Sequence, residues 1–264
     1  MKRVSELRFG FIDAERYIHN PDDPLSELFR RSFYKSQHLA GVVDPDVYFV
    51  LGEKGTGKTA YAVYASLYMK DTFNADCEFF DKNDFTRFIE VARDLQIEKS
   101  QYSSIWVFIF LISLVQRLDK RGWLSESEDI RHVVDAIKAI NLGGYAEGFS
   151  KCIETVSEIT LLFNLFAGSS DLNIPSSVLR GAKPIFKLTR LTEVCISALG
   201  HFSSDLQFAL YIDGLDVRPE EVAYPDYLGV VSSICNAIWV LSATQLSRIP
   251  PTLKVTIPST ARHF

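Results

Sequence analysis

The sequence predicts an α/β fold in which a parallel β-sheet is flanked by helices. Two short apolar runs rich in β-branched and aromatic residues, 47–51 and 206–212, each lead into a polar loop. A long stretch with mostly helical patterning, residues 82–201, lies between them. Strands that alternate with helices indicate a parallel sheet, because the helix of each connection returns the chain to the same end of the sheet.

The composition is that of an ordinary globular protein with one large or two small domains. The chain has 264 residues, of which 47% are hydrophobic and 23% are charged. A chain of this length buries a core without disulfides or structural metal. The formal net charge of −5 excludes a global electrostatic case for binding nucleic acid or anionic membranes, although a local basic patch would not show in such totals.

The cysteines and the most apolar segment favour a soluble, cytoplasmic protein with no membrane partner. Four cysteines lie in or beside apolar segments and form no CxxC pair, which favours buried, reduced thiols over a zinc site. The most apolar run, residues 105–115, is shorter than the roughly 20 residues that span a bilayer. The N-terminus lacks the apolar centre of a signal peptide. We therefore expect residues 105–115 to form a helix in the core.

The first part of the chain predicts a strand, a helix and a second strand. A turn at residues 20–24 opens a short helix, and Val47–Leu51 then reads as a buried parallel strand. Good helix formers without proline fill Ala60–Lys70, and Cys77–Phe80 is expected to be the second strand. Asp84 is the expected N-cap of the next helix, which runs through Leu95.

The rest of the chain predicts several helices before the sheet resumes. The expected helices are Ser103–Lys120, Ser127–Ile140, Tyr145–Phe166, Leu188–Leu199 and Asp226–Leu246, and the expected strands are Leu206–Ile212 and Leu253–Ile257. The connection between the second and third strands is far longer than a single crossover helix. We therefore expect a sheet domain formed by residues 47–81 and 202–264, with residues 82–201 as a helical insertion.

The loop after the first strand matches the phosphate-binding pattern G-x-x-x-x-G-K-[ST] in full. The loop and the residue that follows it comprise Gly52, Glu53, Lys54, Gly55, Thr56, Gly57, Lys58, Thr59 and Ala60. Glycines let backbone amides approach phosphate closely, successive N–H groups form a concavity for an anion, and the following helix adds its positive N-terminal end. We expect Lys58 to reach the β- and γ-phosphates and Thr59 Oγ1 to coordinate Mg²⁺.

The loop predicts a P-loop NTPase fold that binds a nucleotide. A strand precedes the loop and a helix follows it, as this fold requires. The sequence contains no NKxD-type motif of the kind that reads guanine in GTPases, which favours ATP. Residues 1–46 are expected to form an N-terminal helical segment near the nucleotide base.

A second acidic motif, YIDGLD, follows the apolar run that ends at Ile212. We expect this strand to lie beside the loop strand, so that Asp213 meets the Mg²⁺ held by Thr59, with water between the carboxylate and the ion. Asp216 is the candidate for orienting the attacking water. Glu220 and Glu221 are alternatives for that role, farther along the loop.

The last predicted strand is followed by candidates for a sensor of the γ-phosphate. Additional-strand (ASCE-like) P-loop ATPases often place a polar or basic residue there, and Thr260 and Arg262 occupy this region. Arg262 is a candidate arginine finger, and a plain polar tail is the alternative. A competing interpretation makes Trp239–Thr244 a strand with a helicase-like Ser-Ala-Thr, but DGLD is not a DEAD-like motif and the 227–241 spacing suits a helix.

Together the two motifs, GEKGTGKT and YIDGLD, resemble those of bacterial P-loop ATPases of the STAND and KAP neighbourhood. The FunZ-type P-loop ATPases are similar also in the start, FGFIDAE at residues 9–15, and in an apolar helix around Trp106. The resemblance implies that Lys58 and Thr59 bind phosphate and Mg²⁺, that Asp213 binds Mg²⁺ and that Asp216 is the second acidic residue. The family often has an arginine directly after the last strand, whereas residues 258–261 intervene here before Arg262. A fifth strand and a lid are expected where this sequence stops.

The resemblance implies an ATPase that switches or assembles with its nucleotide state. Such proteins form homo-oligomers and regulate an attached or co-encoded effector protein, including in anti-phage defence. Slow ATP hydrolysis is expected, because no arginine in the same chain is assured. A nucleotide-dependent oligomerisation module with little hydrolysis is the main alternative. A small-molecule kinase fits less well, because the sequence shows no arginine cluster of the kind found in a kinase lid.

Overall fold

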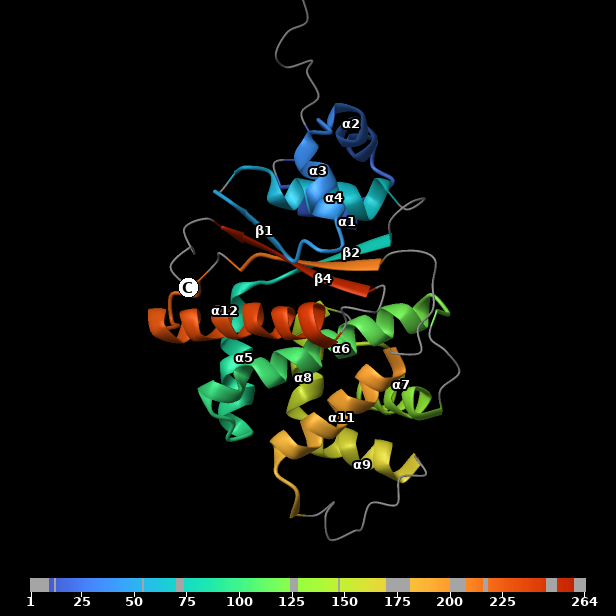
Figure 1. Cartoon of the computed structure of the whole chain (residues 1–264), viewed down its shortest axis with the longest axis vertical. Coiled ribbons are helices and arrows are strands. Elements are labelled where there is room, and N and C mark those ends of the chain that lie inside the picture. Colours follow the sequence, from blue (N-terminus) through green and yellow to red (C-terminus); the bar gives the residue numbers. More distant parts are fainter. Residues whose placement is uncertain are drawn as a thin grey trace, which may run out of the picture.

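The computed structural model is an α/β structure in which helices predominate over a small parallel sheet (Figure 1). It describes residues 10–11, 13–53, 55–69, 74–123, 128–146, 148–169, 181–199, 208–215, 218–245 and 251–258. The strands are β1 (Phe49–Gly52), β2 (Asn74–Phe79), β3 (Phe208–Asp213) and β4 (Pro251–Pro258). The helices before β3 are α1 (Glu15–His19), α2 (Pro24–Ser32), α3 (Gln37–Val43), α4 (Lys58–Tyr68), α5 (Lys82–Asp94), the 3₁₀ turn η2 (Lys99–Gln101), α6 (Tyr102–Lys120), α7 (Glu128–Ile140), α8 (Gly148–Ser157), α9 (Ile159–Ser169) and α11 (Pro184–Leu199). After β3 come α12 (Tyr224–Trp239) and a π-helical turn, η3 (Val240–Gln245).

The four strands are parallel and lie in the order β1-β4-β3-β2. Gly52 is in register with Pro258, and Phe79 with Asp213, so the carboxyl ends of the strands meet at one edge of the sheet. The four predicted strands are confirmed. The prediction that the Asp213 strand lies beside the loop strand is wrong, because β4 lies between them. Short apolar runs show that a chain forms strands, but they do not show the order in which the strands pair.

Helices cover both faces of the sheet (Figure 1). Helices α1 to α4 lie over one face, called here the α4 face, and α12 lies over the other, the α12 face. Side chains of β3 alternate between the two faces of the sheet. Ala209 and Tyr211 belong to the hydrophobic cluster on the α4 face, and Phe208, Leu210 and Ile212 belong to the cluster on the α12 face. Helices α5 to α11 form the predicted helical stretch between β2 and β3. They lie on the same side of the sheet as α12.

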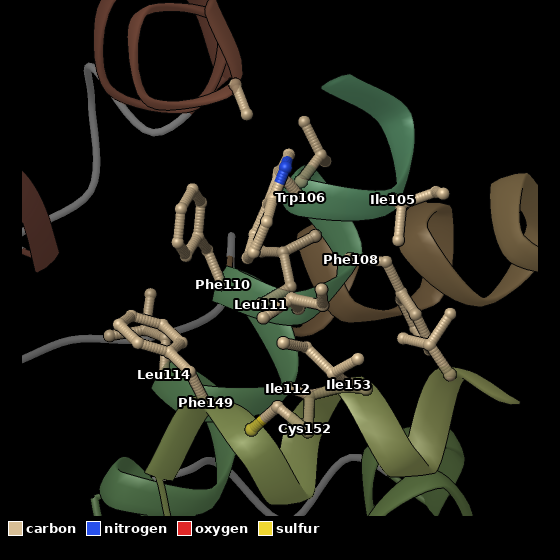
Figure 2. Packing of buried hydrophobic residues seen from close by; sticks show 14 of the residues in the cluster. Ile105, Trp106, Phe108, Phe110, Leu111, Ile112, Leu114, Phe149, Cys152 and Ile153 are labelled. Carbon is tan, nitrogen blue, oxygen red and sulfur yellow. The ribbon is translucent and has the colours of Figure 1, made fainter. Parts of the chain in front are cut away.

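The two hydrophobic clusters differ in the size of their side chains. The cluster on the α4 face is small and rich in alanine, with Ala62 and Ala65 of α4 packed against Ala75 and Ala209. The cluster on the α12 face is large and aromatic. Figure 2 shows Trp106 and Phe110 of α6 near Phe149 of α8, and Trp106 also stacks on Phe88 with ring centroids 4.3 Å apart. The helical stretch therefore shares one core with the sheet.

Helix α6 is the buried core helix that the sequence predicts. Every residue from 105 to 115 is buried. By length and composition alone, Lys99–Lys120 and Tyr224–Ala243 would be long and apolar enough to cross a membrane. A core helix meets the same criteria, because the interior of a protein and that of a bilayer both select apolar side chains.

The four cysteines are free thiols. Burial raises the pKa of Cys152 and of Cys195 to about 12. It also raises the pKa of Cys77 to about 12, where Ser66 is a hydrogen-bonding neighbour. A thiol with so high a pKa is rarely ionised at neutral pH, so these side chains serve as apolar groups.

Three predicted helix boundaries are wrong, each for a local reason. Asp81, and not Asp84, caps α5. The side chain of Asp81 accepts a hydrogen bond from the backbone amide of Asp84, and the carboxylate of Asp84 accepts one from the backbone amide of Asp81. The predicted helix Tyr145–Phe166 is two helices, because the chain turns at Glu158. The predicted helix Asp226–Leu246 gives way at Val240 to the π-helical turn, which also excludes the strand of the helicase interpretation.

Candidate functional site

The loop between β1 and α4 has the backbone that its glycines predict. Gly55 and Gly57 have φ angles of +84° and +86°, values that side chains with a Cβ rarely adopt. Gly57 is the N-cap of α4, and no side chain among the described residues caps this helix end. The first amides of α4 thus follow directly on the loop, and this is the arrangement that binds anions at helix N-termini.

Lys58 folds back over the start of its own loop. Its Nζ donates to the carbonyl oxygens of Gly52 and Glu53 at 2.9 and 3.0 Å. The hydroxyl of Thr56 donates to the same Glu53 oxygen at 2.8 Å. Among the described residues, no carboxylate forms an ion pair with Lys58. An ammonium held only by neutral carbonyls gains a stronger, charge-assisted partner when an anion enters the loop.

Thr59 and Asp213 meet, although 154 positions separate them in the sequence. Thr59 Oγ1 donates a hydrogen bond to Oδ2 of Asp213, while the amide of Gly214 donates to Oδ1 at 2.9 Å. Asp213 is only 8% exposed. The prediction that these two side chains lie together is confirmed, although β4 lies between β1, which leads into the loop, and β3, which ends at Asp213. The alanines of the α4 face explain why Thr59 reaches Asp213, because their small side chains let α4 approach the sheet closely.

Gly214 fixes the chain directly after the acidic residue. Its φ angle is +88°, and a Cβ at this position would collide with the backbone of Phe80. Phe80 N donates to the carbonyl of Asp213 at 2.8 Å, so β2 and β3 stay paired up to this point. The sequence analysis did not give this glycine a role. The Asp-Gly dipeptide after an apolar strand was the available signal, because it often marks a positive φ angle.

Four of the predicted site residues lie outside the described residues: Lys54 in the loop, Asp216, and the sensor candidates Thr260 and Arg262. Ala60 lies in the first turn of α4. Glu220 and Glu221, the alternatives to Asp216, are exposed residues of the turn before α12. The described part of the site is therefore the loop, Lys58, Thr59 and Asp213.

The described groups fit a nucleotide phosphate with Mg²⁺. A hydroxyl and a carboxylate that already contact each other are the kind of oxygen donors that Mg²⁺ prefers, and the ion takes its remaining ligands from water and phosphate. The described residues contain no group of three His, Cys, Asp or Glu side chains placed to hold a metal. A site of this kind needs no such group, because Mg²⁺ is seldom enclosed by protein ligands alone.

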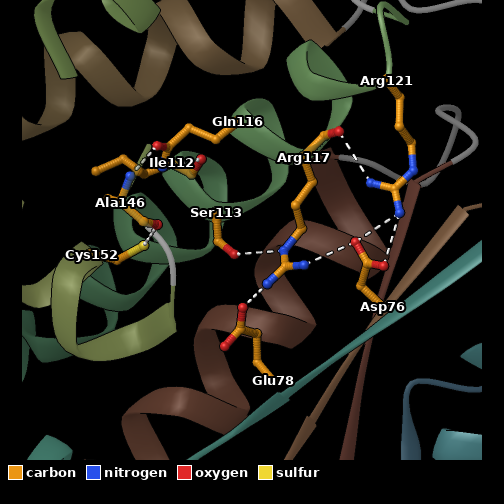
Figure 3. A network of polar contacts seen from close by, with 9 residues as sticks. All are labelled: Asp76, Glu78, Ile112, Ser113, Gln116, Arg117, Arg121, Ala146 and Cys152. Carbon is orange, nitrogen blue, oxygen red and sulfur yellow. Dashed lines mark hydrogen bonds and ion pairs between the residues drawn. The ribbon is translucent and has the colours of Figure 1, made fainter. Parts of the chain in front are cut away.

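A second polar cluster joins β2 to α6 on the α12 face (Figure 3). Arg117 contacts both Asp76 and Glu78, and Arg121 Nη2 donates to both oxygens of Asp76 at 2.8 and 3.0 Å. Ser113 accepts from Arg117 Nε at 3.3 Å. Burial favours a higher pKa for Asp76, but the two arginines outweigh it and hold that pKa below its ordinary value. We call these four charged residues the β2–α6 network.

A cavity of about 560 Å³ opens beside the β2–α6 network. Its walls come from β2, α6, α1 and the start of α8, and they include all four network residues together with Glu15 and His19. The sequence analysis did not identify this cluster, because its acids and bases lie about 40 residues apart on different elements. The charges of the network are paired with one another, which indicates a structural role.

No protein-family model, curated protein or solved structure matches the chain.

Proposed function

We propose that the chain binds ATP with Mg²⁺ through Gly52–Thr59 and hydrolyses it slowly as a nucleotide-dependent switch. The contact between Thr59 and Asp213 carries this proposal. A complete phosphate-loop motif places a hydroxyl at the start of a helix, and a separate acidic motif brings a carboxylate to it from the end of another strand. Two independent sequence motifs that meet in space indicate one shared ligand.

The strand order supports an additional-strand P-loop fold. β4 lies between β1 and β3, so one added strand separates the loop strand from the acidic strand. The loop and Asp213 both lie at the carboxyl edge of the sheet, where open α/β sheets bind their ligands. The resemblance to STAND and KAP ATPases adds to this support through the same two motifs.

The proposed roles follow from the chemistry of each group. The loop amides and Lys58 bind the phosphates, and Thr59 and Asp213 hold Mg²⁺, which neutralises charge on the phosphate oxygens. Asp216 is proposed to orient the attacking water, and Arg262 to stabilise charge on the transferred group. Positioning and electrostatic stabilisation account for most of the catalysis in phosphoryl transfer.

The proposed setting is a cytoplasmic protein that assembles with further copies of itself and controls an effector protein. The burial of residues 105–115 supports the soluble state. The large helical region on the α12 side offers surface for partners beyond the nucleotide site. A role in anti-phage defence follows only from the family resemblance.

Phosphate release tests the proposal. We expect slow, Mg²⁺-dependent release from ATP by the native chain, and release at least about tenfold slower from Asp216→Asn. The control is Asp94→Asn, which replaces an exposed aspartate that pairs with its neighbour Arg93 and should match the native rate.

The size of the protein is measured with and without ATP–Mg²⁺ in the same samples. Assembly without phosphate release would favour the oligomerisation module over the ATPase. Absence of ATP binding would contradict both.

A further inference from the structure

A basic and aromatic surface lies on the helices that cover the α4 face of the sheet. Its hollow of about 630 Å³ is lined by three cationic side chains, Arg30, Arg31 and Lys35, and by four aromatic ones. The aromatic residues come from the segment directly after α2 and from the second half of α4. We call it the α2–α4 surface. Tyr68, at its far end, follows Lys58 by ten residues, about 15 Å along the helix axis.

The cations of this surface are accessible. The Arg30 and Arg31 side chains are 52% and 76% exposed. Both pair with the single carboxylate of Glu27, and exposed pairs of this kind hold an arginine only weakly. Lys35 Nζ lies 5.6 Å from the centre of the Tyr64 ring. Three positive charges thus face one negative charge, on a chain whose formal net charge is −5.

Three of the aromatic side chains are packed or hydrogen-bonded, and the ring of the fourth, Tyr34, is exposed. Phe33 and Tyr64 stack with ring centroids 4.1 Å apart, and the Tyr68 hydroxyl donates to the carbonyl of Ser26 at 2.8 Å. Tyr34, which lies between Phe33 and Lys35 in the sequence, is 81% exposed. Water is a poor environment for a tyrosine ring, so an exposed ring beside cations offers a stacking platform for a flat, negatively charged ligand.

We propose that the α2–α4 surface binds single-stranded nucleic acid. Arg30, Arg31 and Lys35 contact the phosphates of a short stretch of the strand, and Tyr34 stacks on an unpaired base. This combination of a basic groove and an aromatic platform is how proteins bind single strands without reading their sequence. The site is separate from the phosphate loop, and it requires no nucleotide there.

The free ring of Tyr34 favours a single strand over the other polyanions. In a duplex the bases already stack on one another, so they cannot cover the ring unless a base is first unpaired and extruded from the stack. An acidic peptide satisfies the arginines but offers no flat ring to Tyr34. A contribution from Tyr34 that does not depend on salt therefore distinguishes a single strand from both.

Fluorescence anisotropy of the full chain tests this proposal. The probes are labelled oligo-dT and oligo-rU of about 20 nucleotides, titrated without ATP at salt between about 50 and 200 mM. We expect Tyr34→Ala to weaken binding about tenfold at every salt concentration. Replacing Arg30, Arg31 and Lys35 together by glutamine should reduce the slope of log K against log salt by about two, because each phosphate contact contributes roughly 0.7.

Two control variants match these changes elsewhere on the molecule. Arg190→Gln removes an arginine that pairs with Glu193 three positions away, as Arg30 pairs with Glu27. Tyr224→Ala removes another exposed tyrosine, at the start of α12. Both controls should bind the probes as the native chain does, and circular dichroism checks that all variants are folded.

Three results would overturn the proposal. The first is the absence of any anisotropy change with either probe. The second is native binding by a folded Tyr34→Ala or by the glutamine variant. The third is that duplex DNA or polyglutamate displaces the probe as effectively as an unlabelled single strand does.

Discussion

The β1–α4 loop of the candidate site and the β2–α6 network both gather polar side chains from distant parts of the sequence, but they use charge differently. In the network, Arg117 and Arg121 face Asp76 and Glu78, so positive and negative charges balance. In the loop, Lys58 faces only neutral carbonyls among the described residues. Removing one partner of a buried charge pair destabilises the fold because the other charge is left uncompensated, whereas a cation without a counter-charge is available to an anionic ligand.

The two regions also differ in backbone conformation. The network rests on regular elements, β2 and α6, beside the large aromatic core. The candidate site depends on glycines with positive φ angles at Gly55, Gly57 and Gly214. Such conformations are retained where the surrounding structure holds them, and they concentrate at functional sites. We therefore expect substitutions in the network to change stability, and substitutions in the loop to change binding.

The largest expected effect is that of Lys58→Ala on ATP binding. Removing the ammonium should weaken binding by several hundredfold, about 3.5 kcal/mol, because the phosphates lose their charged donor. The free energy of unfolding should change by less than about 0.5 kcal/mol. Calorimetric titration and urea unfolding measure the two quantities, with Lys82→Ala, an exposed lysine of α5, as the control. Retained ATP affinity would reject the role of Lys58.

The next effect is that of Arg117→Met on stability. The substitution keeps much of the apolar stem but leaves Asp76 and Glu78 without one of their partners. We expect unfolding free energy to fall by about 2–3 kcal/mol, with ATP affinity unchanged in the folded protein. Urea unfolding is the measurement, and Arg93→Met, whose arginine is exposed, is the control. A large loss of ATP affinity would show that the two regions are not independent.

Gly214→Ala should have a smaller effect on stability and should also disturb the site. The positive φ angle and the close backbone of Phe80 leave no room for a methyl group. We expect a loss of about 1–2 kcal/mol in unfolding free energy and weaker binding of ATP–Mg²⁺, because Asp213 is displaced. Gly168→Ala is the control, since a Cβ there meets open space on a helix. Equal behaviour of the two variants would contradict this account of Gly214.

The smallest expected effect is the acid sensitivity that Asp76 gives to the network. Its pKa is lower in the folded chain than in the unfolded chain. A carboxyl of this kind adds stability above its unfolded pKa, and that stability is lost as the pH falls through the folded pKa. The difference in unfolding free energy between native protein and Asp76→Asn should therefore shrink as the pH falls below about 4. A difference that stays constant down to acid unfolding would contradict the prediction.

Much of the fold was predictable because it depends on local patterns. The four strands and most helices follow from apolar periodicity, and Thr59 and Asp213 were paired because each belongs to a recognisable motif. The N-cap of α5 was misplaced by three residues, because Asp81 and Asp84 are both capping residue types and only the backbone distinguishes them.

The features that were missed depend on tertiary packing. The position of β4 between β1 and β3 depends on which strands pair, and no single run of residues encodes that order. The β2–α6 network joins Asp76 to Arg117 and Arg121 across most of α5 and α6. On the sequence these are ordinary charges, and only the crossing of β2 and α6 brings them together.

One titration tests the central claim, that Thr59 and Asp213 hold the same Mg²⁺ beside a bound nucleotide. ATP affinity is measured with and without Mg²⁺ for the native chain, Thr59→Val and Asp213→Asn. We predict that Mg²⁺ strengthens binding to the native chain and that either substitution removes this gain while affinity without Mg²⁺ is kept. Equal losses of affinity with and without the ion, in both variants, would contradict the account.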